Sequence, residues 1–381
     1  FEGRIPLQFG ALPDVEQEVV VYGFPEGGDT LSTTRGVISR IEHQRYAHST
    51  LELLAGQLDA AVNPGNSGGP VILEGRIVGV IMQLLHQAQN IGYMVPVPVI
   101  RHFMEDLQDG KYHGFPEDGI LCQDMENRAI REKHGLNKEQ TGALVISVLP
   151  GTPAEGEIFP GDVVLAIDGY DVADDCTVEF RPGERTSMNY CTQIHQVGED
   201  MNLEILRDGE KRDLRVRLDT AWGFHKLIPM MLYDALPAYY IYGGLVFSPL
   251  TINYLLTWGG QPDREAPPDL VNYLLFDEPT VEGEEVVLLI KVLSSGVNSG
   301  YRDFVNSRIT KVNGRKVKNL KELVRIVEEE PQDPYVVFTT ARGFRMVLDR
   351  KEVEKEKEKI FNTYRIPSDC SDNLREGPAL H

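Results

Sequence analysis

The stretch AAVNPGNSGGPVI, residues 60–72, holds the residues best suited to do chemistry in this chain. It sets Ser67 in a tight, glycine-rich loop with strand-forming residues on both sides. A serine presented in this way acts as a nucleophile in acyl transfer once a base takes its proton and a third group orients the base. The backbone amides of Gly65 and Ser67, aimed at one point, would then form an oxyanion hole. For the short motif alone, a plain hairpin between two strands is the alternative.

The sequence offers no clear base for Ser67. Nine histidines are present, and His86, in the polar loop LLHQAQN, is the nearest to the expected substrate cleft. Asp59 lies just before the serine loop, and we interpret it as a structural residue. No HExxH motif and no CxxC pair is present, so we expect no metal site and no cofactor. The irregular spacing of the four cysteines predicts no disulfide framework and favours a reducing compartment.

The segments around the serine loop predict short strands. Their Gly and Pro punctuation is typical of an all-β barrel or sandwich, which we assign to residues 1–107. The last part of this region, PVIRHFMEDL, has apolar residues at helical spacing and should pack on the outside of the strands. Residues 108–113 follow as a linker. The predicted strands are EVVVYGF, TLSTTRGVISRIE, LELLAGQLDAAV, PVILEGRIVGVIMQ and NIGYMVPVP.

Two further units of mixed β and α character follow the linker. Residues 114–219 contain strands, a short turn-rich helix and an Asp-Gly turn, and residues 236–350 repeat this order loosely. Residues 351–381 form a charged C-terminal tail, in which Lys351 to Lys359 is a charged helical run and the remainder reads as mostly exposed and polar. The fold class is therefore mostly β with some α.

The composition excludes several classes of function. A net charge of −20 argues against a nucleic-acid surface, which needs clustered Lys and Arg. The apolar run 245–256 is interrupted by Ser248 and Pro249 and falls short of the roughly 20 residues of a membrane helix. We therefore expect no transmembrane segment, and any membrane association should be peripheral. No GxxxxGK[ST] motif is present, which fits an activity without ATP.

With these motifs in place, the chain resembles the Deg/HtrA serine peptidases. Residues 1–107 look like the second, serine-bearing β-barrel of their chymotrypsin-like protease domain, and the two following units look like PDZ domains. The strings YGFPEGGDTLSTTRGVISRIE and GLVFSPLTINYL look most like the plant-type Deg proteases of chloroplasts and related organelles. The resemblance covers nearly the whole chain.

The resemblance implies roles for particular residues. Ser67 would be the nucleophile, with the amides of Gly65 and Ser67 as oxyanion donors. Small or apolar side chains would border the primary specificity pocket, which implies cleavage after apolar residues. The pocket residues would be Ala61, Val62, Val80, Ile81 and Met82.

The PDZ-like units imply peptide binding by strand addition, with a loop of amides that captures a terminal carboxylate. In the first unit this loop would be FPEDGI, with Gly119 and Ile120 at the site. Pro116 lacks an amide, and Glu117 and Asp118 would repel a carboxylate, so the ligand is an internal segment or is absent. Docking surfaces of an oligomer are the alternative for both units. In the second unit the peptide-binding residues would be Gly244, Leu245, Val246 and Phe247.

In this family the catalytic histidine and aspartate lie in a preceding barrel, which has no counterpart in this sequence. We therefore expect the chain to be the C-terminal portion of an ATP-independent endopeptidase, inactive by itself. The complete enzyme would act on damaged or unfolded proteins as a homo-oligomer, a trimer or hexamer. The alternative is a non-proteolytic PDZ scaffold or chaperone that has lost the first barrel. A chloroplast location, stromal or thylakoid-associated, is expected, with the mitochondrion or nucleus as alternatives.

Overall fold

The structure is a computed structural model of the chain. It divides into two compact units, which are treated separately below. The first unit comprises Phe1–Val148 and Thr152–Trp222, and the second comprises Leu149–Gly151 and Gly223–His381. The structure describes residues 3, 5–26, 29–46, 49, 51–84, 91–231, 233, 235–329 and 333–375.

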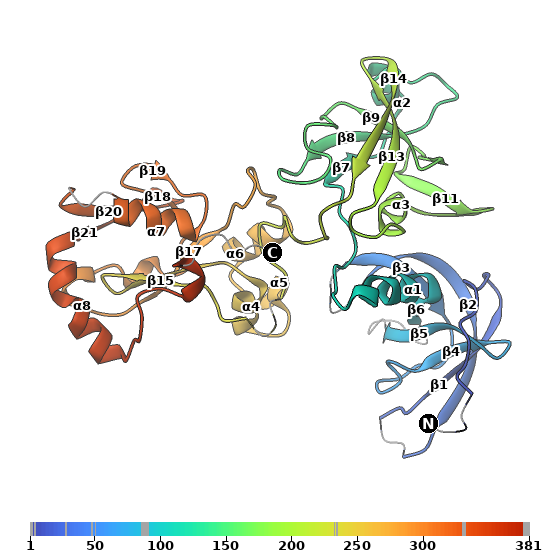
Figure 1. Cartoon of the computed structure of the whole chain (residues 1–381), viewed down its shortest axis with the longest axis horizontal. Helices are drawn as coiled ribbons and strands as arrows, with labels where there is room; N and C mark the ends of the chain where they lie inside the picture. The colour runs from blue at the N-terminus through green and yellow to red at the C-terminus, as the bar shows by residue number, and fades with distance from the viewer. Residues whose placement is uncertain are drawn as a thin grey trace. The chain divides into compact units, whose positions relative to one another are not determined.

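The first unit begins with a closed antiparallel barrel of six strands in the order β1-β2-β3-β6-β5-β4 (Figure 1). Along β1 the exposed and buried residues alternate, as expected for a strand with one face in a core. Helix α1 (Val97–Asp106) packs against β5 and β6 from outside, and the turn η1 (Leu107–Asp109) follows it. The predicted barrel and external helix are therefore confirmed. The strands are β1 (Glu18–Gly23), β2 (Ser32–Arg45), β3 (Glu52–Leu58), β4 (Pro70–Leu73), β5 (Arg76–Leu84) and β6 (Gly92–Pro96).

The rest of the first unit is a second sheet with short helices. Its strands run in the order β14-β13-β9-β8-β7, with β10 paired to β9, so that β7 is an edge strand. The hairpin β11–β12 stands apart from this sheet. The elements are β7 (Ile120–Gln123), α2 (Arg128–Lys133), β8 (Ala143–Val148), β9 (Val163–Ile167), β10 (Tyr170–Asp171), β11 (Thr177–Arg181), β12 (Glu184–Ser187), α3 (Asn189–Gln193), β13 (Asp200–Arg207) and β14 (Glu210–Arg217).

The hairpin β11–β12 joins this sheet domain to the barrel. Phe180 of the hairpin and Tyr190 of α3 pack against the core of the barrel. The Arg181 guanidinium donates to the main-chain oxygen of Pro13 at 2.9 Å. Apolar packing and hydrogen bonds thus explain why the barrel and the sheet domain form one unit.

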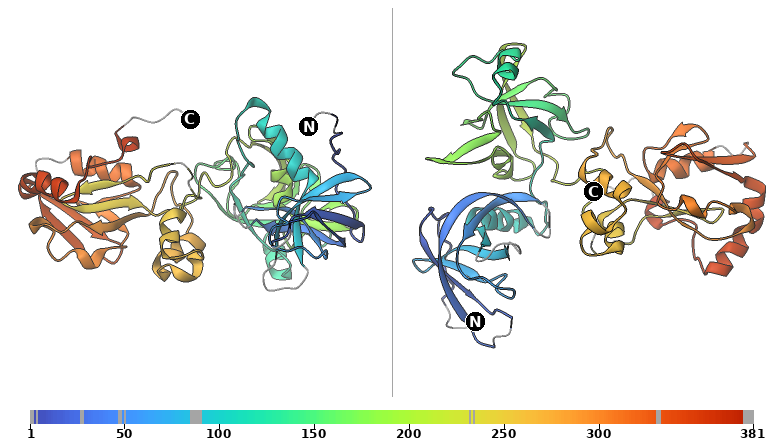
Figure 2. Two further views of the ribbon diagram at one scale, coloured as in Figure 1. Left: turned by 90° about the horizontal axis from the view of Figure 1, so that it is seen from below. Right: turned by 180° about the vertical axis from the view of Figure 1, so that it is seen from behind.

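The second unit has two sheets and a helical insertion. One sheet has the order β15-β16-β17 and the other β19-β18-β20-β21. The insertion, from α4 to α6, packs in a separate apolar cluster that also includes Leu288 of the sheet, and Figure 2 shows it beside the sheets of this unit. Its elements are β15 (Tyr240–Tyr242), β16 (Leu245–Pro249), α4 (Ile252–Leu255), η2 (Leu256–Trp258), α5 (Pro262–Glu265), α6 (Pro268–Leu275), β17 (Val287–Val292), η3 (Gly296–Asn298), η4 (Arg302–Phe304), β18 (Ile309–Val312), β19 (Arg315–Lys316), α7 (Leu320–Glu329), β20 (Tyr335–Thr340), β21 (Arg345–Asp349), α8 (Arg350–Tyr364) and η5 (Asp372–Leu374).

The C-terminal segment contains the helix expected from residue 351, but it packs against the second unit and does not form an exposed tail. Helix α8 buries Val353 and Ile360, and Val353 and Cys370 belong to the main core of the second unit. The main chain also pairs with β15, since the Ile241 amide donates to the Asp369 oxygen at 2.7 Å. The sequence did not reveal this packing, because the many Lys and Glu residues of α8 outnumber the few apolar residues that face the core. No helix in the described part of the chain is long and apolar enough to cross a membrane.

Candidate active site

Ser67 lies at the surface of the barrel, in the loop between β3 and β4. Its side chain is exposed, while the preceding Asn66 is 3% exposed and packs beneath the loop. The Ser67 hydroxyl donates to the main-chain oxygen of Met82 in β5 at 3.3 Å. The loop therefore presents the serine outward, as the sequence predicted.

Close backbone packing holds the serine loop in place. The Gly69 Cα lies so near the Tyr22 oxygen of β1 that a Cβ there would overlap it. Gly65 has a φ of +95°, and a Cβ there would approach the Phe24 oxygen to 2.6 Å. Only glycine fits both conditions, positive φ at one position and close approach at the other. Gly69 is thus explained by the contact of the loop with β1, and Gly65 by its contact with residues 24–26, which follow β1.

The amides of the loop divide into bonded and unbonded groups. Those of Asn66, Gly68 and Gly69 donate to the oxygens of Asn63, Ile81 and Asn66. Among the hydrogen bonds of the described residues, none has the amide of Gly65 or Ser67 as its donor. These two amides remain available to a ligand beside the Ser67 hydroxyl.

The five predicted pocket residues fall into two groups. Val62 and Ile81 are 6% and 2% exposed and belong to the core of the barrel. Ala61 is exposed, and Val80 and Met82 are partly buried, so these three side chains can reach a ligand at the surface. The backbone of Ile81 contacts the serine loop: its oxygen accepts from the Gly68 amide, and its amide donates to the Gly69 oxygen.

Four of the described histidines, His43, His102, His113 and His195, hydrogen-bond groups other than Ser67. His43 contacts Thr186 Oγ1 at 2.7 Å and Gln193 Oε1 at 2.9 Å, and burial lowers the pKa of its imidazole. His113 pairs with Asp109. In the part of the chain that the structure describes, no histidine hydrogen-bonds Ser67. His86, the nearest candidate on sequence grounds, lies outside the described residues, as do His48 and His381.

Asp59 has the structural role expected from the sequence. Its carboxylate accepts from the Val37 amide at 2.6 Å and joins β2 to the start of the serine loop. All four cysteines are free thiols. Over the described residues, no group of three or more His, Cys, Asp or Glu side chains is placed to hold a metal ion.

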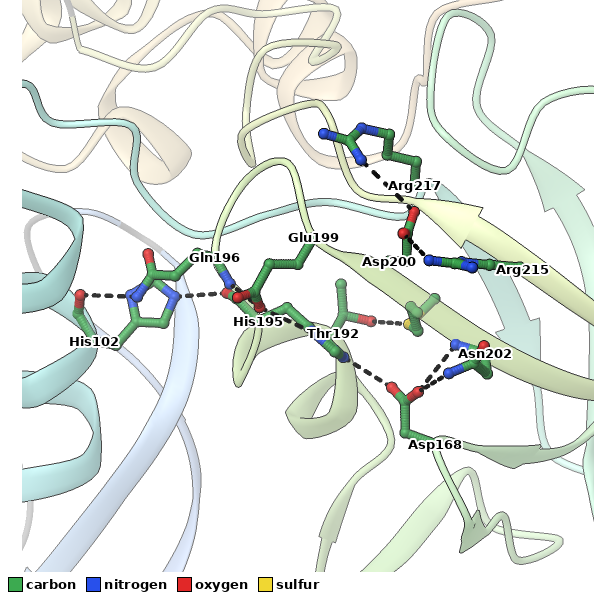
Figure 3. A network of polar contacts seen from close by, with 11 residues as sticks. His102, Asp168, Thr192, His195, Gln196, Glu199, Asp200, Asn202, Arg215 and Arg217 are labelled. Carbon is green, nitrogen blue, oxygen red and sulfur yellow. Dashed lines mark hydrogen bonds and ion pairs between the residues drawn. The ribbon is translucent and has the colours of Figure 1, made fainter. Parts of the chain in front are cut away.

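A polar network that the sequence did not predict links the barrel to the sheet domain (Figure 3). His102 Nε2, on α1, donates to the main-chain oxygen of His195 at 2.7 Å. His195 in turn contacts Asp168 Oδ2 at 2.8 Å and Glu199 Oε2 at 3.2 Å. The histidines are far apart in the sequence, so only the folded chain reveals that they share one network.

In the sheet domain, the predicted peptide site lies at the start of the edge strand β7. Gly119 has a φ of +82°, and a Cβ there would overlap Thr152. The Ile120 amide donates to the carboxylate of Asp118 at 2.7 Å. The outer edge of β7 is unpaired among the described strands, since its partner there is β8 alone.

In the second unit, the structure corrects the predicted peptide site at Gly244, Leu245, Val246 and Phe247. Gly243 and Gly244 form the turn of a hairpin, and β16 pairs with β15 on one side and β17 on the other. Leu245 and Phe247 are fully buried. A peptide cannot add to β16, because both of its edges are already hydrogen-bonded.

Comparisons with known proteins agree with these domains. A trypsin-like peptidase model matches residues 3–80, and two PDZ models match residues 119–218 and 228–373. Protease Do-like 4, mitochondrial, of Arabidopsis thaliana is 39% identical over 97% of this chain and 68% of its own length. The chain belongs to the Deg/HtrA family of serine proteases. The sheet domain of the first unit is hence its first PDZ domain, and the second unit holds another.

Other Deg/HtrA proteins are also similar to this chain. Protease Do-like 2, chloroplastic, of Arabidopsis thaliana is 36% identical over 99% of this chain and 61% of its own length. A solved HtrA-type protease with a bound tripeptide is 25% identical, with a TM-score of 0.44, and covers 55% of this chain and 68% of its own. The chain thus spans about two thirds of the length of these relatives.

Proposed function

We propose that this chain supplies the nucleophile side of a Deg/HtrA serine endopeptidase. The observation that carries the proposal is the exposed Ser67 hydroxyl beside the unbonded amides of Gly65 and Ser67. In acyl transfer, the serine oxygen attacks the scissile carbonyl carbon and its proton passes to a histidine. The two amides then stabilise the negative charge on the carbonyl oxygen, and loss of one such donor lowers kcat about 10²–10³-fold.

The base and its orienting aspartate are proposed to come from outside the described residues of this chain. The Ser67 proton is directed to the Met82 oxygen, which cannot act as a base. Several of the described histidines have other partners, among them Thr186 and Gln193 for His43 and Asp168 for His195. Without its base the serine attacks slower by several powers of ten, so the 381-residue chain is proposed to be inactive alone.

The proposed substrates are damaged or unfolded proteins, cleaved after small or apolar residues without ATP. An extended segment reaches the serine loop only in an unfolded chain, and Ala61, Val80 and Met82 offer no charge to pair with a basic side chain. Peptide segments are proposed to bind a PDZ domain, and the complete enzyme is proposed to be a homo-oligomer. Relatives named for both chloroplasts and mitochondria support an organelle location.

A non-proteolytic scaffold or chaperone is the second candidate. It is favoured by one observation, that no described histidine reaches Ser67. The two candidates differ in whether the native protein uses Ser67 chemically.

Active-site labelling tests the proposal on the protein isolated from its own cells. Such protein should react with a fluorophosphonate at Ser67 and should degrade unfolded casein. A Ser67→Ala variant should lose both properties and keep its fold. Native protein that neither reacts nor cleaves, although it binds casein, would favour the scaffold.

A further inference from the structure

The loop before β7 is already occupied by one of its own side chains. A PDZ domain binds an extended peptide along an unpaired strand edge, and backbone amides at the start of that strand capture the terminal carboxylate. In the first PDZ domain this edge belongs to β7, and the amides belong to residues 115–120. The hydrogen bonds of this loop decide what kind of peptide end it can accept.

Three positions of the loop offer no free amide to a ligand. Pro116 has no N–H group, and the Glu117 amide donates to the Thr220 oxygen at 2.9 Å. The Ile120 amide, the first of β7, donates to Asp118 Oδ1 at 2.7 Å. A carboxylate of the chain itself thus holds the amide that a peptide terminus would need.

The second oxygen of Asp118 joins the loop to α3. Thr192 Oγ1 donates to Asp118 Oδ2 at 2.5 Å, and Thr192 is itself 4% exposed. The Ala154 amide donates to the Asp118 main-chain oxygen at 3.1 Å. One oxygen of the Asp118 carboxylate is therefore bonded by the strand and the other by the helix. These bonds fix the position of the side chain.

Burial of Asp118 raises the pKa of its carboxyl group, and the hydrogen bonds from Thr192 and Ile120 oppose the rise. A second carboxylate brought to the same place would find the Ile120 amide already bonded and would meet the Asp118 oxygens. Two carboxylates at one site cannot both stay ionised without a large cost in free energy.

We propose that Asp118 is an intramolecular occupant of the carboxylate site and restricts the first PDZ domain to internal peptide segments. A segment that continues past the loop can still add to the outer edge of β7, whereas a free C-terminus is rejected. The inference rests on the proposed peptide binding and names its ligand class. It does not depend on the chemistry of Ser67.

The test compares matched peptides on the 381-residue chain. Fluorescein-labelled decapeptide pools ending in valine are prepared as free acids and as C-terminal amides, and binding is followed by fluorescence anisotropy. The unaltered chain should bind the acid no more tightly than the amide. Asp118→Ala frees the Ile120 amide, so this variant should prefer the acid by about tenfold or more.

Two variants control for shape and for charge. Asp118→Asn keeps an oxygen that can accept from the Ile120 amide, so it should gain less preference for the acid than Asp118→Ala. Glu126→Ala removes an exposed acid close after β7 and should change neither affinity. A strong acid preference in the unaltered chain, or none in a folded Asp118→Ala variant, would overturn the proposal.

A measurement on the unaltered chain does not depend on the folding of any variant. The amide NMR signal of Ile120 should keep its position when millimolar free-acid peptide is added. A shift produced by the acid and not by the amide would mean that the terminus displaces Asp118, and the proposal would be wrong. Fluorophosphonate labelling of Ser67 in the native protein is a separate readout, so failure of the protease proposal is distinguishable from failure of this one.

Discussion

The Ser67 hydroxyl donates to the Met82 main-chain oxygen at 3.3 Å. The serine is exposed at the surface, but no base among the described residues is bonded to its hydroxyl to activate it as a nucleophile. The hydroxyl keeps its proton, since a peptide oxygen is a far weaker base than imidazole. The loop around it is nevertheless held tightly, with bonds from Gly68 and Gly69 to its neighbours. Position and activation are therefore separate properties of this site, and they can be tested separately.

The first prediction concerns activation. The purified 381-residue chain should show no labelling by a fluorophosphonate at Ser67 and no cleavage of unfolded casein. The reason is that the described residues provide no base within hydrogen-bonding distance of the hydroxyl. Intact-mass spectrometry measures the label, with Ser67→Ala as control. Stoichiometric labelling would mean that a base is present, and His86 would be the first residue to mutate.

The second prediction concerns specificity. An enzyme that uses this serine loop should cut after Val, Ala or Leu, because Ala61, Val80 and Met82 form an uncharged surface beside Ser67. Mass spectrometry of a digested peptide library measures the preference. A preference for Lys or Arg would contradict the assignment of these residues to the pocket.

The third prediction concerns the glycines of the loop. Gly69→Ala places a Cβ on the Tyr22 oxygen and should destabilise the first unit by about 3 kcal/mol or more. Gly68→Ala is the matched control, since its φ is +85° but no atom lies within 4 Å of the added Cβ. It should cost about 1 kcal/mol, from backbone strain alone. Urea unfolding of the first unit measures both, and equal losses would argue against the contact with β1.

The fourth prediction concerns pH and the attachment of the first PDZ domain to the barrel. Burial lowers the pKa of His43 from its ordinary value of 6.5, while hydrogen bonding to Gln193 and the charge of Glu52 oppose this. Between the lowered pKa and 6.5 the unfolded chain binds more protons, so stability rises with pH and is lost as the pH falls below 6.5. The slope should reach at most about 1.4 kcal/mol per pH unit for this one group.

Hydrogen exchange of β12 between pH 8 and pH 5 measures this effect, because Thr186 of β12 is one of the two partners of His43. His43→Gln should flatten the pH dependence. His134→Gln, at the end of α2, is the control and should leave it unchanged. An unaltered slope in His43→Gln would assign the pH dependence to other groups.

The fifth prediction concerns the C-terminal helix. Ile360, at 3% exposure, anchors α8 to the second unit, and Ile360→Ala should cost about 2–4 kcal/mol of the free energy of unfolding of that unit. Glu358→Ala changes an exposed residue of the same helix and should stay within about 0.5 kcal/mol. Thermal unfolding followed at the second unit measures both. Equal unfolding midpoints for the two variants would mean that α8 does not pack against the second unit.

The sequence was sufficient to predict the barrel strands, the serine loop and the structural role of Asp59. The strands and the loop show in patterns along the chain, alternating apolar residues for β1 and a cluster of glycines around Ser67, while the role of Asp59 followed from the family resemblance. Composition misled at α8, where the many charged residues obscured two buried positions, Val353 and Ile360. The sequence of β16 likewise led to a wrong peptide site, because a strand's sequence does not reveal whether one or both of its edges are paired.

The sequence by itself determined the chemistry that is present: one serine in a loop that only glycines permit, and peptide-binding domains behind it. The tertiary structure decided which of the polar groups already have a hydrogen-bond partner within the chain. Asp118 meets Thr192 and His43 meets Gln193, across separations of 74 and 150 residues. Hydrogen bonds of this kind depend on atoms within about 3 Å of each other. Distances that short between remote residues exist only once the chain has folded.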